Sequence, residues 1–191
     1  MKNKFYIFLL TFTLFGLIMS ACGTDINSNM SEEMNDFSFI TQDKEPLQLD
    51  DLKGEWWITY LSYTECDTVC PRTTSNMVDI QNELKEDGLH PQIISFNVDP
   101  ENDGPEDLRD YANENDVDLN SWDFLTGYDF KTIQTFSEQS FHAALEKGAA
   151  ERYSHSYMFY LVNPNGEVVK KYDGMSTKEH KILIEDLKSV L

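Results

Sequence analysis

The run EWWITYLSY, which begins at Glu55, constrains the fold of this 191-residue chain more than any other segment. Its aromatic and β-branched residues are too continuous for a strand with one exposed face, so the run predicts a central strand that is buried on both faces of a sheet. A helix is expected next, because Pro71 suits a first helical turn, Gly88 supplies a stop, and apolar residues recur on one face at Met77, Ile80 and Leu84. A buried strand that leads into a helix indicates an α/β protein.

The alternation of strand and helix continues to the end of the chain. The elements expected in order are a strand at 92–98, a helix from Pro105, a strand at 122–125, a helix at 129–139, a strand at 156–162, its hairpin partner at 167–172, and a last helix capped by Ser176 with Leu183, Leu187 and Leu191 facing inward. Two short strands, 37–40 and 47–49, precede them. This order predicts a thioredoxin-like α/β fold, with a central mixed β-sheet flanked by helices and an N-terminal β-hairpin extension.

The first 36 residues are expected to lie outside the folded domain. Residues 1–21 carry two lysines, an apolar core and small residues before Cys22, which is the layout of a secretory signal, and LIMSAC resembles a bacterial lipoprotein signal. In that pattern Cys22 carries lipid, and the polar residues 22–36 form a flexible tether to a domain at 37–191. The resemblance places the domain on the outer face of the bacterial cytoplasmic membrane. An uncleaved anchor helix and a plain secretory signal are the alternatives, and both also place it outside the cytoplasm.

The chain is acidic, with 15 basic and 34 acidic residues and a formal net charge of −19 at pH 7. A surface of this sign repels nucleic acid and anionic lipid headgroups, so no nucleic-acid partner is expected. Contact with a membrane is expected only through a lipid anchor. Solubility explains the charge without a dedicated basic partner.

Cys66 and Cys70 stand between the first buried strand and the helix, and they allow three interpretations: a disulfide, a redox pair or a metal site. The unpaired N–H groups at a helix start favour negative charge, which lowers the pKa of a thiol placed there. Outside the cytoplasm two unguarded thiols oxidise by default, so the pair needs a thiol reductant or a metal. Two thiolates are soft ligands, which favours Cu(I), with Zn(II) as the alternative.

A third ligand would come from one of the four histidines. His90, His142 and His180 are expected to be solvated, the last in the exposed first turn of the C-terminal helix. His155 stands in RYSHSYMFYLV, at the entry to a buried strand. In a thioredoxin-like arrangement that entry lies beside the strand-to-helix junction of the cysteines, so His155 is the candidate ligand.

The chain resembles the Sco/SenC family of copper chaperones over nearly all of residues 37–191, with its motifs in the family order. The matching residues are Tyr63, Thr64, Cys66, Cys70 and Pro71; Val98, Asp99 and Pro100, followed by Pro105; and His155 and Ser156 before YLVNPNG.

This resemblance implies a thioredoxin-like fold, copper bound by Cys66, Cys70 and His155, and assistance in assembling the binuclear copper site of a cytochrome c oxidase subunit. It also implies an alternative, a thiol-disulfide oxidoreductase that reduces the cysteines of that subunit or of another exported protein. The two cysteines would then be the redox-active pair and would form a disulfide when oxidised. Asp99 is expected near the site, either behind a ligand or only as a turn residue before Pro100.

Two positions differ from the common family pattern. Ser154 stands where many members have Asp before the histidine, and Asp67 adds negative charge where many have Pro. Two other functions fit less well. A peroxidase of the thioredoxin superfamily would have Thr three residues before the reactive cysteine, where this chain has Tyr63. A purely structural disulfide between Cys66 and Cys70 would close a loop too short to stabilise the fold much.

Overall fold

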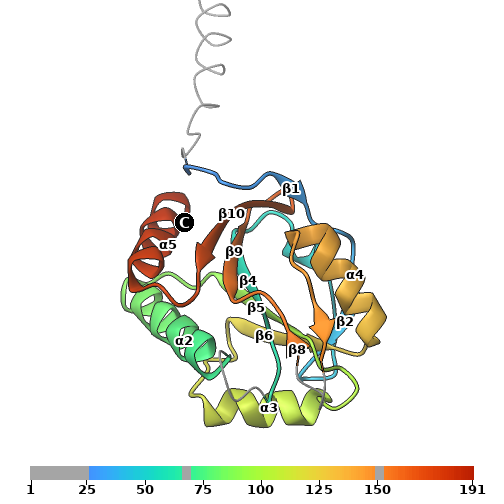
Figure 1. Ribbon diagram of the computed structural model, residues 1–191. Helices are drawn as coiled ribbons and strands as arrows, with labels where there is room; N and C mark the ends of the chain where they lie inside the picture. The colour runs from blue at the N-terminus through green and yellow to red at the C-terminus, as the bar shows by residue number, and fades with distance from the viewer. Residues whose placement is uncertain (1–25, 66–69, 149–152) are drawn as a thin grey trace, which may run out of the picture.

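A mixed sheet runs through the molecule with the strand order β1-β10-β9-β4-β5-β6-β2-β3 (Figure 1). The computed structural model describes residues 26–65, 70–148 and 153–191. The strands of this sheet are β1 (Glu32–Glu33), β2 (Ser38–Thr41), β3 (Pro46–Gln48), β4 (Trp57–Ser62), β5 (Gln92–Asn97), β6 (Trp122–Thr126), β9 (Met158–Val162) and β10 (Glu167–Asp173). The helices are η1 (Leu49–Leu52), α2 (Cys70–Glu86), α3 (Pro105–Glu114), α4 (Phe130–Phe141) and α5 (Thr177–Val190). β7 (Glu146–Lys147) and β8 (Tyr153–Ser154) pair in a second, two-stranded sheet.

Three parallel strands, β4, β5 and β6, form the centre of the large sheet. Parallel neighbours need a crossover connection, which α2 supplies between β4 and β5 and α3 supplies between β5 and β6. All residues of β4 are buried, as the sequence predicts. β9 runs antiparallel to β4 with Thr59 opposite Tyr160, so the start of β9 lies beside the end of β4.

Helices cover both faces of the sheet, with α2 and α5 on one side and α4 on the other (Figure 1). Successive residues of a strand point to opposite faces, and β4 follows this rule. Ile58 and Tyr60 belong to the core beneath α2, α3 and α5, whereas Trp57 and Leu61 belong to the core beneath α4. The helical residues of the first core are Met77, Val78, Ile80, Leu84, Leu108, Tyr111, Ala112, Leu183, Ile184 and Leu187. The predicted inward positions of α2 are therefore confirmed.

The N-terminal β-hairpin is also confirmed. β2 and β3 pair antiparallel, and β2 joins the large sheet by pairing with β6. Phe37 and Phe39 place their rings against Phe96 and Phe136, so the hairpin extends the core on the α4 side. The α/β architecture, a mixed sheet flanked by helices with this extension, is the predicted one.

Residues 29–36 differ from the flexible tether that the sequence predicts. The Asn29 side chain bonds the backbone N–H and C=O of Lys171, and β1 pairs with the start of β10. Met34 is buried, and its N–H donates to the carbonyl of Gly166. Polar composition suggests a tether, but one buried methionine and the open edge of β10 are enough to hold this segment. This part of the chain therefore belongs to the folded domain.

The last helix departs from the prediction at its end. Leu183 and Leu187 are buried, but Leu191 is 47% exposed because it follows the final turn of α5 rather than continuing its inward face.

Among the described residues, no helix has the length and apolar character needed to cross a membrane.

Candidate metal and redox site

β4 and α2 are the elements on either side of the segment in which the sequence places the cysteine pair. β4 ends at Ser62, and α2 begins at Cys70, so the junction of a buried strand with a helix start is present where the sequence predicts it. Cys66 and the side chain of Cys70 lie outside the described residues. The backbone of Cys70 is the first of α2, and the N–H groups at a helix start favour a thiolate.

His155 lies on the short segment between β8 and β9, and its position is defined by a contact with the end of β4. The ring of His155 packs edge-on against Tyr63, with 5.7 Å between ring centroids and an interplanar angle of 79°. Tyr63 is three residues before Cys66. The antiparallel pairing of β9 with β4 thus brings His155 to Tyr63, across 92 residues of sequence, at the strand end that leads into the cysteine pair.

The imidazole of His155 is oriented by the backbone of the next residue. Its Nδ1 lies 2.8 Å from the carbonyl oxygen of Ser156, which favours the tautomer with the proton on Nδ1 and the lone pair on Nε2. The Ser156 hydroxyl bonds the Tyr160 hydroxyl at 2.8 Å and accepts the N–H of Met158. These bonds fix the segment that carries His155, and a backbone carbonyl does the orienting that an acidic neighbour at position 154 would otherwise do.

Asp99 is buried just after the end of β5, where its carboxylate makes two kinds of contact. As a turn residue, it accepts bonds from the Asn102 amide at 3.0 Å to each carboxylate oxygen. Towards the site, its Oδ1 accepts the hydroxyl of Tyr153 at 2.8 Å, and burial together with this bond raises the pKa of Tyr153 to about 12. The Tyr153 ring packs against Tyr63 at 5.3 Å. Asp99 therefore lies behind the segment that carries His155.

A second contact lies beside Tyr153, in the short sheet formed by β7 and β8. Lys147 in β7 reaches Glu101 at 2.7 Å, and its ammonium lies 5.6 Å from the centre of the Tyr153 ring. The hydrogen bond to Glu101 is the main cause that raises the pKa of Lys147. Exposed pairs of this kind contribute little stability, so we assign it a secondary role beside the buried Tyr153–Asp99 bond.

The sequence prediction missed Asp103. This carboxylate is 2% exposed, and it accepts the N–H and the hydroxyl of Thr64 at 2.9 and 2.6 Å. Burial is the first cause that raises its pKa to about 6, although both bonds from Thr64 act in the opposite direction. Asp103 lies in DPENDG, which has turn composition. The one available signal is that this turn follows a parallel strand, at the sheet edge where sites form in α/β proteins.

The other histidines lie elsewhere. His90 is exposed, and His142 pairs with Glu32 at 2.8 Å. His180 corrects the prediction, since it is buried rather than solvated: its Nε2 lies 3.0 Å from the Gly174 carbonyl oxygen, and its ring packs on Phe159. A helix start need not be exposed when the preceding turn folds back over it.

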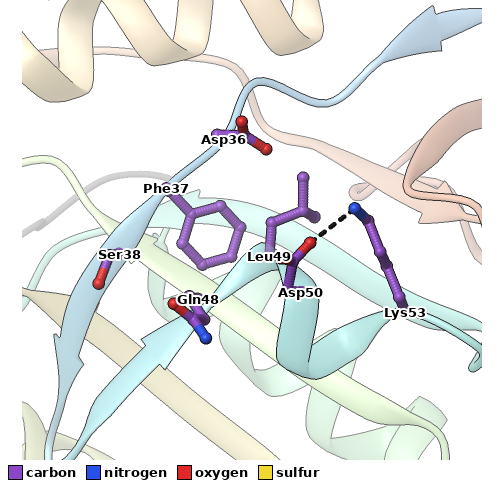
Figure 2. Close-up of a pocket in the computed structure, with 7 residues that line it drawn as sticks. All are labelled: Asp36, Phe37, Ser38, Gln48, Leu49, Asp50 and Lys53. Atoms are coloured by element: carbon purple, nitrogen blue, oxygen red, sulfur yellow. Dashed lines mark hydrogen bonds and ion pairs between the residues drawn. The ribbon is translucent and has the colours of Figure 1, made fainter.

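A shallow hollow beside the N-terminal hairpin has a volume of about 540 Å³ (Figure 2). Its lining residues are Asp36, Phe37, Ser38, Gln48, Leu49, Asp50 and Lys53. Its one ion pair, Lys53 with Asp50 at 2.6 Å, is exposed and joins a residue of η1 to the residue that follows this helix. Nothing in this lining resembles a catalytic or metal-ligating set.

Within the described part of the chain, no three His, Cys, Asp or Glu side chains form a metal site. Cys66 and the side chain of Cys70, two of the three predicted ligands, are not among the described parts of the chain. The donor set given by the sequence, two thiols and one imidazole with its lone pair on Nε2, fits a soft metal of low coordination number.

A family model described as SCO1/SenC matches residues 26–191. The chain belongs to the SCO1/SenC family. The SCO1 protein homolog of Bacillus subtilis is 40% identical over 182 residues, which cover 94% of each protein. A more distant relative, 28% identical over 68% of this chain and 63% of its own length, is named a putative copper-binding protein of Stutzerimonas stutzeri.

Solved structures agree with the sequence matches. The crystal structure of a SCO1/SenC family lipoprotein from Bacillus anthracis has a TM-score of 0.80 and 36% identity, covering 84% of this chain and 97% of that one. A structure described in terms of a disulfide switch in BsSco, a member of the Sco family of cytochrome c oxidase assembly proteins, has a TM-score of 0.76 and 38% identity, covering 84% and 94%. These likenesses establish the thioredoxin-like fold of this SCO1/SenC protein.

Proposed function

We propose that this SCO1/SenC protein is an extracytoplasmic copper chaperone that assists assembly of the binuclear copper site of cytochrome c oxidase, with copper held by Cys66, Cys70 and His155. The observation that carries the proposal is the packing of His155 on Tyr63. It brings the only candidate nitrogen ligand to the strand end from which the chain continues to the two thiols.

The ligand chemistry supports copper as the cargo. Two thiolates supply negative charge and soft donor atoms, and these favour Cu(I) over harder cations. An imidazole adds a borderline donor that also suits Cu(II). A relative in the family is named a putative copper-binding protein. The fixed Nδ1 contact of His155 means that binding through Nε2 needs no change of tautomer.

The proposed location and partner rest on the sequence and on relatives. Residues 1–21 would be removed as a signal peptide, Cys22 would carry lipid, and the domain would work on the outer face of the bacterial cytoplasmic membrane. The B. anthracis relative is described as a lipoprotein, and BsSco as a member of a family of oxidase assembly proteins. The copper-site subunit of cytochrome c oxidase is the proposed partner, and a thiol reductant of the envelope would keep the cysteines reduced.

The test is an anaerobic titration of the reduced protein with Cu(I) and Cu(II), comparing His155→Ala with His90→Ala. We expect one copper per chain, a copper affinity that falls at least tenfold in His155→Ala, and no change in the exposed His90→Ala control. Cys66→Ala and Cys70→Ala should each abolish tight binding. Equal copper affinity in the two histidine variants would remove His155 from the ligand set.

A second candidate function is thiol-disulfide exchange on the cysteines of the oxidase subunit or of another exported protein. The observation that favours it is the start of α2 at Cys70, because helix N-termini favour thiolates in general, and BsSco is described with a disulfide switch. In this reaction one cysteine thiolate attacks the partner's disulfide, and the other cysteine then displaces the reduced partner and closes a Cys66–Cys70 disulfide. An envelope dithiol reductant restores the pair. Rapid reduction of insulin would support a general reductase, and its absence would limit the activity to a dedicated partner.

A further inference from the structure

Asp103 is a buried carboxylate that the proposed ligand set does not use. Both of its oxygens are occupied by one residue of another element, since Thr64 donates its backbone N–H to Oδ2 and its hydroxyl to Oδ1. Thr64 is the second residue after β4 and the second residue before Cys66. One bond from the backbone and one from the side chain of the same residue fix the direction of Thr64 as well as its position.

The carboxylate is itself held in place by the loop between β5 and α3. The backbone N–H of Asp103 donates to the Asp99 carbonyl at 2.9 Å, and its own carbonyl accepts the Thr126 hydroxyl at 3.0 Å. The Asn97 amide also reaches this carbonyl, at 3.3 Å. The backbone bonds of Asp103 therefore hold its carboxylate in place, and the carboxylate in turn holds Thr64.

Helix capping does not explain Asp103. Both carboxylate oxygens of Asp103 are bonded to Thr64, and the cap N–H of Gly104 before α3 donates instead to the carboxylate of Asp107 at 2.9 Å. Nor does simple packing explain it, because a buried carboxylate costs stability unless its hydrogen bonds compensate. The bonds that compensate here all come from the chain that leads to Cys66.

We propose that Asp103 is a positioning residue for Cys66, acting through Thr64 to fix the direction in which the chain leaves β4. The inference rests on the proposed function, since it concerns the same cysteine pair. The loop that holds Asp103 also holds Asp99, which bonds Tyr153 on the segment of His155. One loop thus bonds both Thr64, which precedes the cysteine pair in sequence, and Tyr153 on the segment that carries His155.

The test measures two properties of the full chain in detergent, in a Cys22→Ser background: copper affinity, and the dithiol–disulfide equilibrium constant against glutathione. Asp103→Ala should weaken copper binding ten- to a hundredfold, the range seen when groups behind metal ligands are removed. It should also change the equilibrium constant at least tenfold, which is about 30 mV for this two-electron couple. Asp103→Asn should restore both properties to within about threefold of wild type, because its amide oxygen accepts the Thr64 N–H and its NH₂ donates to the hydroxyl.

The matched control is Tyr128→Phe. The hydroxyl of Tyr128 donates to the carbonyls of Asn97 and Leu125 in the same region but does not bond Thr64. This variant should therefore lose stability while it keeps the bonds between Asp103 and Thr64. If Asp103→Ala and Tyr128→Phe alter the two properties in proportion to their lost stability, or if Asp103→Asn fails to restore them, the positioning role is refuted. Wild-type protein that binds no copper would refute the proposed function, while the glutathione equilibrium would still decide the role of Asp103.

Discussion

Ionisation of Asp103 should make the fold less stable as the pH rises from about 4 to about 7. Burial raises the pKa of this carboxyl from 3.8 to about 6, with Asp99 and Asp107 adding to the effect and the bonds from Thr64 opposing it. In the unfolded chain the group titrates near 3.9. Between these values the folded state keeps a proton that the unfolded state has lost, so the free energy of unfolding falls with pH. The stabilisation is complete below about pH 4 and is lost above about pH 6.

The expected size follows from the shift of about two pKa units, which corresponds to about 3 kcal/mol. The assay is urea unfolding of wild type and Asp103→Asn at pH 4 and pH 7.5. The amide cannot ionise, and every other titrating group contributes nearly equally to both proteins. The stability of the variant relative to wild type should therefore increase by about 3 kcal/mol between the two pH values. Parallel pH profiles for the two proteins would refute the claim that the folded state buries this charge at neutral pH.

Three further substitutions test other contacts. Tyr153→Phe removes the hydroxyl bonded to Asp99 and should cost about 1.5 to 3 kcal/mol by urea unfolding while lowering copper affinity, whereas unchanged values would exclude support of the histidine segment. Gly174→Ala would place a Cβ 2.3 Å from the carbonyl oxygen of Tyr157, and the forced shift should cost about 1 to 3 kcal/mol; a thermal midpoint equal to wild type would contradict this packing. Asp186→Ala removes the carboxylate that pairs with the buried Lys170 of β10 and should cost about 3 kcal/mol by urea unfolding; a free energy of unfolding equal to that of wild type would contradict this.

The sequence predicts the sheet and helices well because their signals are local. EWWITYLSY is apolar on both faces, and β4 lies at the centre of the sheet with both faces covered. The position of His155 could also be predicted, since it needs only the fold topology, which places the start of one central strand beside the end of its antiparallel neighbour.

The contacts that support the site could not be predicted in the same way. Asp103 bonds Thr64 across 39 residues, and Asp99 bonds Tyr153 across 54. An acid in a turn usually faces solvent, and no local pattern distinguishes one that a folded loop buries. These bonds form only where the ends of different strands lie side by side in the fold. A single sequence does not specify which side chains meet there.

Burial was underestimated at two places for related reasons. The segment 29–36 has the composition of a tether, but its backbone completes the edge of β10. His180 stands at a helix start, where exposure is the usual expectation, but it is covered by the turn at Gly174. In both cases a backbone partner from a distant part of the chain outweighs local polarity.

X-ray absorption spectroscopy of the copper-loaded protein tests the ligand set most directly. The reduced protein with one equivalent of Cu(I) should show two sulfur ligands, and the Cu(II) form should add an imidazole nitrogen that is lost in His155→Ala. A copper site with no sulfur ligand, or one that is unchanged in His155→Ala, would contradict a centre built from Cys66, Cys70 and His155.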